Sequence, residues 1–458
     1  MGNRYLVVSD VHLSDIEEHA DGWKAYKSAR RAIDEPLRDL IAQFVADGEA
    51  AGATRLTLIL NGDIIDFDVV TATPDNPPWP LRRDERTRGL HPTEEKSIWK
   101  LKRILADHPT FVRTRAEFIA RGHRIVYVMG NHDREFHFDG VQKAFTEAIV
   151  AINPAARADA IRFEPWFFHV PGEIYAEHGQ QYDYYSSFRY ILSPVVATSR
   201  GTAIALPMGN LSGRLLASQM GFFNPYTHEF ILNLFSYIAH WFRHYAFSRH
   251  SLVWTWFTGS LLVIFRLLRQ KNDTRDPPRD YDARLDEAAR RASLPRATID
   301  ALGNLHRKPI TTQFFRILRE FWIDRLLISI GMTGGTIALA LVDIPIWIKL
   351  VVPLSCFPLV YFIFEWFTRG ENVMSVDHVV PGYAARIAAL LGVKVVTFGH
   401  THQPRLIPLA KDVSFVDTGT WAPMTSAKSP EVQRRGFRNY LSVAFEASGP
   451  IVVFGSWM

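Results

Sequence analysis

Residues 125–133 read IVYVMGNHD, a run of five apolar residues followed directly by glycine, asparagine, histidine and aspartate. The apolar run is typical of a buried strand, and the polar residues come where that strand would end. The same arrangement stands at 5–12 (YLVVSDVH) and at 56–63 (LTLILNGD). Side chains just beyond the carboxyl ends of strands meet at one rim of an α/β sheet. The sequence therefore predicts an α/β fold with a polar site at that rim.

Two further polar clusters follow predicted strands later in the chain. His178-Gly179 follows the strand predicted at 174–176, and Gly399-His400-Thr401-His402 follows the one at 394–398. The remaining pattern predicts helices at 23–46, 98–121, 281–292 and 383–391, and strands near 413–417 and 441–445. The five clusters thus come from segments far apart in the chain.

The donor atoms in these clusters are carboxylates, amides and imidazoles, with no thiolate. This set suits Mn²⁺, Fe²⁺ or Zn²⁺. In Asp10-x-His12 and in His400-x-His402 the two side chains are two residues apart, so on an extended strand both would leave the same face. Each pair is therefore predicted to bind one ion.

Composition excludes several classes of protein. With 47% hydrophobic and 22% charged residues among 458, the chain is not disordered. The single Cys356 excludes an internal disulfide and a cysteine zinc site. A net charge of +5 is too small to indicate nucleic acid, so no nucleic-acid partner is expected. The chain has no P-loop and no serine nucleophile elbow, which argues against NTPases and serine hydrolases.

Three apolar segments lie in the middle of the chain. Residues 251–265 and 326–342 carry no charge, and 346–364 is interrupted only by Lys349. A helix of about 20 residues spans a bilayer, so the last two segments are predicted to form a membrane hairpin. The alternatives are a large buried helical domain or an apolar lid that lies on the membrane.

Topology limits the number of spans. The polar clusters precede and follow the apolar segments but must meet on one side of the membrane, so full spans are even in number. Either 251–268 lies in the membrane interface, or it pairs with 230–245 to make four spans, or no segment spans.

In order, the blocks D-x-H, G-D, G-N-H-D, H and G-H-x-H resemble the signature of the calcineurin-like metallophosphoesterases. The resemblance covers about 1–183 and 376–458. It implies a four-layer α-β-β-α sandwich, an α/β fold. The resemblance leaves 184–375 unexplained, and the apolar composition of that range predicts an α-helical, membrane-associated insertion that splits the domain. The resemblance also implies two divalent ions, with Mn²⁺ as the first expectation and Fe²⁺ or Zn²⁺ as alternatives.

The resemblance assigns a role to each site residue. It implies that one ion is held by Asp10, His12, Asp63 and His402, and the other by Asp63, Asn131, His178 and His400. His132 would protonate the leaving oxygen, and Asp133 would orient His132. The paired ions would clamp the phosphoryl oxygens and lower the pKa of a water, which as hydroxide attacks phosphorus in line. Asp66, close after Asp63, is either a partner of the site or a turn residue.

The wording of the motifs is similar to that of the UDP-2,3-diacylglucosamine pyrophosphatase branch, although this chain has His132 where that branch usually has arginine. The branch implies lipid metabolism: cleavage of a phosphoester or pyrophosphate in an amphiphilic, lipid-linked substrate at the membrane surface. Arg82 and Arg83, in a proline- and arginine-rich loop predicted at 71–92, are candidate substrate contacts.

The expected partners are therefore a phosphorylated amphiphilic or nucleotide-linked substrate and membrane lipid. The expected location is the cytoplasmic face of the membrane, with peripheral attachment or an even number of spans. Two alternatives stay open: a membrane-anchored phosphodiesterase or phosphatase of soluble nucleotides, and a membrane scaffold with a structural metal site. The sequence does not define the oligomeric state.

Overall fold

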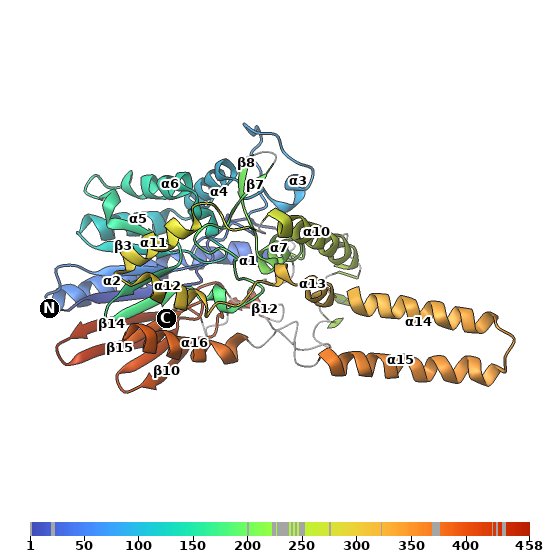
Figure 1. The fold of residues 1–458 in the computed structure, drawn as a ribbon. Helices are drawn as coiled ribbons and strands as arrows, with labels where there is room; N and C mark the ends of the chain where they lie inside the picture. The colour runs from blue at the N-terminus through green and yellow to red at the C-terminus, as the bar shows by residue number, and fades with distance from the viewer. Residues whose placement is uncertain are drawn as a thin grey trace.

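A computed structural model gives the fold of the chain (Figure 1). It describes residues 2–19, 23–198, 201–221, 226, 238–239, 241–242, 245–246, 252–273, 276–321, 323–368, 376–423, 425–426, 429–432 and 437–458. Most of the predicted segment 230–245 lies outside the described residues, so the four-span alternative is not addressed by the structure.

A six-stranded sheet carries the first polar clusters at the ends of its central strands. Its order is β15-β14-β1-β2-β3-β4. Strands β1 to β4 run parallel to one another, β14 runs antiparallel to β1, and β15 runs antiparallel to β14. The strands are β1 (Arg4–Val8), β2 (Thr57–Asn61), β3 (Arg124–Val128), β4 (Ile161–Glu164), β14 (Asn439–Glu446) and β15 (Gly449–Ser456). The C-terminal part of the chain thus completes a sheet begun at the N-terminus.

A five-stranded sheet carries the other two clusters. Its order is β10-β11-β9-β6-β5, with β9 parallel to both β6 and β11. The strands are β5 (Phe167–Val170), β6 (Ile174–Glu177), β9 (Val395–Phe398), β10 (Arg405–Ala410) and β11 (Val413–Asp417). Because β9 lies beside β6, the segments containing His178 and His400 end at the same edge.

Strand alternation produces the four layers. In β1, Tyr5 and Val7 face the second sheet, where they join Ile174 and Val395 in one buried cluster. Leu6 and Val8 face the opposite way, into a cluster with the helices that cover the first sheet. A third cluster fills the space between the second sheet and its own helices. The predicted α-β-β-α sandwich is confirmed.

The outer helices are mostly short and amphipathic. The first sheet is covered by α2 (Asp34–Ala50), α4 (Glu94–Asp107), α5 (Pro109–Ala120) and α6 (Asp139–Val150). The second is covered by α11 (Tyr281–Ala292), α12 (Arg296–Gly303) and α16 (Val376–Leu391). The range 184–375, predicted as an insertion, therefore contributes α11 and α12 to the sandwich itself.

Two predicted helices are broken in the structure. The pattern at 98–121 divides into α4 and α5 because Pro109 disfavours helical backbone at His108, which has φ −126° and ψ 59°. The pattern at 23–46 divides into α1 (Ala25–Ser28), the 3₁₀ turn η1 (Ala29–Ala32) and α2. The loop predicted at 71–92 contains one short helix, α3 (Glu85–Arg88).

Smaller elements connect these layers. The remaining 3₁₀ turns are η2 (Arg134–His137), η3 (Ala158–Ala160), η4 (Gln180–Tyr182), η5 (Ala217–Gln219) and η6 (Ile310–Thr312). Two hairpins pair β7 (Val195–Thr198) with β8 (Gly201–Ile204) and β12 (Thr425–Ser426) with β13 (Ser429–Val432). Helices α7 (Met208–Leu215) and α10 (Leu252–Asp273) pack into the core of the first sheet through Leu211, Leu215, Val263 and Leu267.

An apolar helical hairpin projects from the domain. After α13 (Phe314–Glu320), α14 (Ile323–Leu341) runs outward and α15 (Ile346–Thr368) returns beside it (Figure 1). Both are long and apolar enough to cross a membrane, and none of their most apolar 18 residues is buried in the protein. Arg325 ties the domain ends of the two helices together by an ion pair to Glu365 at 2.6 Å. Among the described helices, only these two meet that length and apolarity, so α10 is not a candidate span.

Replacement of Phe145 by alanine tests the packing of the first sheet against α6. The ring of Phe145 lies between Tyr127, Phe136 and Phe163, with centroids 5.4–6.0 Å apart. Its loss leaves a cavity, and we expect a decrease of about 3–5 kcal/mol in the free energy of unfolding. The control Ile152→Ala, at a side chain that is 51% exposed, should change it by less than about 0.5 kcal/mol. Urea unfolding followed by near-UV circular dichroism measures both, and equal effects would contradict the packing described.

Candidate metal centre

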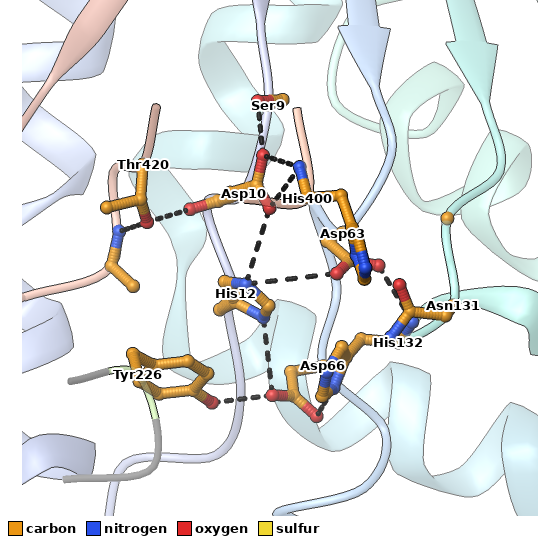
Figure 2. Close-up of polar contacts among 12 residues, drawn as sticks. Ser9, Asp10, His12, Asp63, Asp66, Asn131, His132, Tyr226, His400 and Thr420 are labelled. Atoms are coloured by element: carbon orange, nitrogen blue, oxygen red, sulfur yellow. Dashed lines mark hydrogen bonds and ion pairs between the residues drawn. The ribbon is translucent and has the colours of Figure 1, made fainter. Parts of the chain in front are cut away.

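The five polar clusters meet at the carboxyl ends of five strands. Asp10 and His12 follow β1, Asp63 follows β2, and Asn131 follows β3. His178 follows β6, and His400 and His402 follow β9, so both sheets contribute. Figure 2 shows Asp10, His12, Asp63, Asn131, His132 and His400 converging from these ends. The convergence predicted from the strand ends is present in the structure.

The backbone that presents these side chains is not extended. Asp10, His12, Asp63, His400 and His402 all have φ between 52° and 70°, the left-handed region that non-glycine residues rarely adopt. The prediction that Asp10-x-His12 and His400-x-His402 use strand alternation is therefore wrong, and His400 and His402 belong to different donor groups instead of binding one ion together. Each strand ends before its pair, at Val8 and at Phe398, and the chain then turns sharply. Conformations of this kind cost about 1–3 kcal/mol each and concentrate at functional sites.

The first group of donors comprises Asp10, His12 and His402. The His402 Nε2 atom lies 3.2 Å from Asp10 Oδ1 and 3.1 Å from His12 Nε2. The donor atoms of all three residues lie within 4.8 Å of one another, close enough to hold one ion.

The second group comprises Asp63, His178 and His400, whose donor atoms also lie within 4.8 Å of one another. The Nδ1 atom of His178 is 3.0 Å from the Asn61 carbonyl oxygen, which fixes the ring so that Nε2 faces Asp63 Oδ2 at 3.1 Å. The same Asp63 oxygen is 3.9 Å from His12 Nε2, in the first group. Asp63 therefore stands between the two groups.

The donors fit divalent metal ions. Among the described residues, the buried atoms Asn131 Oδ1 and His178 Nε2 make no hydrogen bond of good geometry, although His178 Nε2 lies 3.1 Å from Asp63 Oδ2. Buried polar atoms left without partners are costly, and a metal ion would satisfy both. Carboxylate, amide and imidazole together form a donor set for Mn²⁺, Fe²⁺ or Zn²⁺. The assignment of the seven residues to two particular ions stays a prediction.

The electrostatics of the site favour positive charge. Burial alone would raise the pKa of Asp63, but His178 and His132 lower this pKa well below its usual range. Burial would lower the pKa of His178, but the carboxylates of Asp63 and Asp10 raise it to about 10. For His12, burial is the largest influence on the pKa and lowers it to about 4. These carboxylates would attract a cation in the same way.

His132 lies at the open side of this cluster. Its ring packs edge-on against His12 with centroids 4.9 Å apart, and its side chain is 21% exposed. Its Nδ1 atom lies 3.2 Å from Asp66 Oδ1 and 3.4 Å from Asp68 Oδ2. Its Nε2 atom makes no hydrogen bond to the described part of the chain. Burial opposes protonation, but Asp66, Asp63 and Asp68 raise the pKa of His132 to about 10.

The expected role of Asp133 requires a correction. Its carboxylate accepts hydrogen bonds from the backbone N–H groups of Ile64 and Gly130 and from the Tyr127 hydroxyl, at 2.6–2.8 Å. These bonds join the loops after β2 and β3, and within the described residues no hydrogen bond or ion pair joins the carboxylate to the His132 ring. Asp66 and Asp68 occupy the position that the sequence assigned to Asp133.

Several residues at the site were missed in the sequence. Asp66 was considered only as a possible partner, yet Figure 2 shows it contacting His12, His132 and Tyr226. Tyr226 donates to Asp66 Oδ2 at 2.5 Å, and its ring lies 4.5 Å from that of His12. Tyr226 lies inside the predicted insertion, in a stretch without a motif, so no local signal indicated it.

Two more polar residues extend the site. Asp183 Oδ2 lies 3.1 Å from His400 Nε2. Asn210, on α7, donates to Asp68 Oδ2 at 2.8 Å and to the Asn131 carbonyl at 3.0 Å. Both residues lie at or beyond the predicted boundary at residue 183.

The predicted substrate contacts lie apart from the donor cluster. Arg82 forms an ion pair with Asp84 at 3.5 Å. Within the described residues, neither Arg82 nor Arg83 makes a hydrogen bond or ion pair with any of the seven donors. Their role in substrate binding stays a prediction.

Replacement of Gly62 by alanine tests how closely the site is packed. Gly62 has φ +80°, and a Cβ atom there would lie 2.4 Å from His178 Cγ. We expect Gly62→Ala to displace His178 and to lose most of the bound metal. Gly172→Ala is the matched control because Gly172 also has a positive φ, +71°, but open space around it. Manganese per chain, measured by mass spectrometry after gel filtration, should fall only in Gly62→Ala. Equal metal content in the two variants would contradict the described packing.

Comparison with known proteins gives one match. The model of the family described as calcineurin-like phosphoesterase matches residues 4–238, just over half of the 458 residues. The matched range contains Asp10, Asp63, Asn131 and His178 and also reaches Asn210 and Tyr226. His400 and His402 lie beyond it and enter the site through the pairing of β9 with β6. No curated protein matches the chain.

Proposed function

Because this chain belongs to the calcineurin-like phosphoesterase family, whose members are metal-dependent phosphoester hydrolases, we propose that its substrate is an amphiphilic, lipid-linked phosphoester or pyrophosphate cleaved at a membrane surface. One observation carries the proposal. The domain that holds the donor cluster also holds an unburied apolar hairpin, α14–α15, of membrane-spanning length. A soluble substrate would not require this element.

In the proposed site, Asp10, His12, Asp63 and His402 hold one ion, and Asp63, Asn131, His178 and His400 hold the other. The short distances within each donor group and the position of Asp63 between them support this assignment. Two divalent ions held there would neutralise the phosphoryl oxygens and lower the pKa of an attacking water. Mn²⁺ is the first expectation among the ions that fit.

His132 supplies a proton to the leaving oxygen. Its ring is partly exposed beside the donors, and its Nδ1 atom faces Asp66 and Asp68. This arrangement leaves Nε2 for the substrate. Tyr226 donates to Asp66, so Asp66 is held in place from the opposite side. These contacts make Asp66 and Tyr226 positioning residues for His132 and His12.

The hairpin anchors the site at the bilayer. At 1.5 Å per residue, α14 is about 29 Å long and α15 about 35 Å, enough to cross a hydrocarbon core of about 30 Å. Both ends of the hairpin join the domain, so two spans keep all donors on one side. Helix α10 adds an outward stripe of large apolar side chains, namely Trp254, Phe257, Leu261, Phe265 and Leu268. These positions recur every three or four residues, as on the apolar face of a helix lying in a membrane interface.

Charge around the hairpin supports the cytoplasmic face. Three arginines, Arg316, Arg319 and Arg325, stand at the domain end of α14, whereas the far end of the hairpin has one basic residue, Lys349, beside Asp343. Basic residues near span ends are retained on the cytoplasmic side. The domain would therefore lie in the cytoplasm.

Replacement of His132 by alanine tests its role in proton transfer. We expect kcat to fall by about 10²- to 10⁴-fold, the usual contribution of a general acid. The metal content should stay unchanged because His132 is not among the seven proposed ligands. Asp63→Asn is the control that should lose both metal and activity. Phosphate release at saturating Mn²⁺ measures the rate, and a wild-type rate in His132→Ala would favour a scaffold with a structural metal site.

The substrate class is tested by removing the hairpin. Residues 323–368 are replaced by a short Gly/Ser linker, which the adjacency of Arg325 and Glu365 allows. We expect the variant to fold, since the hairpin buries little against the domain. It should lose flotation with vesicles and most of its turnover of UDP-diacylglucosamine and other lipid diphosphates. Turnover of bis(p-nitrophenyl) phosphate should stay the same.

Comparison of substrates in the full chain completes this test. Products are followed by mass spectrometry, with Asp63→Asn as the blank. Preference for acylated substrates over UDP-sugars supports the proposal. Equal or faster turnover of soluble nucleotides would reduce the hairpin to an anchor and favour the soluble-nucleotide phosphodiesterase.

A further inference from the structure

A cavity lies between the segment 79–96, the β7–β8 hairpin, α7 and α10, and α7 also carries Asn210, which contacts the donor residue Asn131. Its volume is about 630 Å³. Its lining includes apolar side chains, among them Ile204, Leu206 and Leu211. It also includes five cationic side chains, which are Arg82, Lys96, Arg214, Arg266 and Arg269. A cavity lined by both kinds of side chain matches an amphiphile with an anionic group.

The positive charge of this cavity is only partly neutralised. Asp84 pairs with Arg266 at 2.6 Å and with Arg82 at 3.5 Å, and Glu85 pairs with Lys96 at 2.5 Å. Glu95 is the one acidic residue that lines the cavity. Within the described residues, neither Arg214 nor Arg269 has a carboxylate within ion-pair distance. Positive charge is therefore in excess.

Arg214 is the strongest indication of a ligand. Only 4% of this residue is exposed. Its Nη2 atom donates to the Gly89 carbonyl at 2.7 Å and its Nε to the Arg88 carbonyl at 3.4 Å. Its Nη1 atom makes no hydrogen bond to the described part of the chain. The carboxylates of Asp68, Asp84 and Glu85 act on this guanidinium only at longer range, so a phosphate in the cavity would supply a close negative charge and an acceptor for Nη1.

Two helices that line the cavity, α7 and α10, relate it to the metal centre and to the side of the domain from which the α14–α15 hairpin extends. Asn210, which contacts Asn131 and Asp68, precedes Arg214 by one turn of α7, about 6 Å. Arg266 and Arg269 come from α10, whose outward stripe contains Phe265 and Leu268. Figure 1 shows α7 and α10 on the side of the domain from which the α14–α15 hairpin extends.

We propose that this cavity binds the phosphate group of an anionic amphiphile, with Arg214 and Arg269 as its contacts and the apolar lining residues against the attached chain. The phosphate belongs either to the substrate or to a bilayer lipid that docks the enzyme. Only the first of these sources rests on the proposed function.

Binding of a short-chain lipid tests the proposal without catalysis. The full chain in detergent, with its metal, is titrated calorimetrically with dioctanoyl phosphatidate and with zwitterionic dioctanoyl phosphatidylcholine. We expect phosphatidate to bind in preference, and Arg269→Ala and Arg214→Gln each to weaken it about tenfold or more. Asp63→Asn should retain this binding, which separates it from phosphate on the metal centre.

Arg113→Ala is the matched charge control. Arg113 is an exposed arginine on α5, away from the cavity, and its loss should leave phosphatidate binding unchanged. If Arg214→Gln fails to fold, Arg269→Ala decides the result because that side chain is exposed. Wild-type affinity in Arg269→Ala and in any folded Arg214→Gln, or no preference for phosphatidate, would overturn the proposal.

Kinetics then identify the source of the phosphate. A raised KM for the lipid substrate in Arg269→Ala, with kcat retained, assigns the cavity to the substrate. An unchanged KM with weakened phosphatidate binding assigns it to a bilayer lipid. If the wild-type enzyme hydrolyses no amphiphile, the proposed function fails, whereas phosphatidate binding in Asp63→Asn still supports the cavity.

Discussion

The carboxylate of Asp63 connects the parts of this site more directly than any other group. One oxygen lies 3.1 Å from His178 in the second sheet and 3.9 Å from His12 in the first. The other accepts the backbone N–H of His132 at 2.7 Å, which fixes the loop after β3. Asp63 can do this because its backbone has φ +53° and because Gly62 and Gly130 leave no Cβ atoms in the way. The two sheets, the strained strand ends and the donor groups all depend on this close approach.

Much of this arrangement could be predicted because it is encoded locally. Apolar runs such as 125–128 specify strands, and the polar residues after them lie at the sheet rim by topology alone. Local patterns did not reveal the left-handed backbone at Asp10 or His402, since it depends on contacts across the two sheets. Asp66 and Tyr226 were also beyond prediction as a pair, because the bond between them joins residues 160 positions apart. The predicted role of Asp133 was wrong for the same reason, because its hydrogen-bond partners Ile64 and Tyr127 can be identified only from the fold.

The middle of the chain contains helices that pack in the sandwich and a hairpin that does not. Helices α11 and α12 pack on the second sheet, and α7 brings Asn210 to the metal centre, so these parts belong to the sandwich. The α14–α15 hairpin instead keeps its apolar surface unburied. The cationic cavity is lined by α7 and α10, and α7 also carries Asn210, which contacts Asn131. The proposed lipid-linked phosphate would require such a cavity between an apolar surface and the donor cluster.

The central claim is that the cluster holds two metal ions that share Asp63. Anomalous scattering from crystals of the full chain grown with Mn²⁺ tests it most directly. The account predicts two manganese peaks about 3.5–4 Å apart, one beside Asp10, His12 and His402 and one beside Asn131, His178 and His400. A single peak, or peaks away from Asp63, would contradict it.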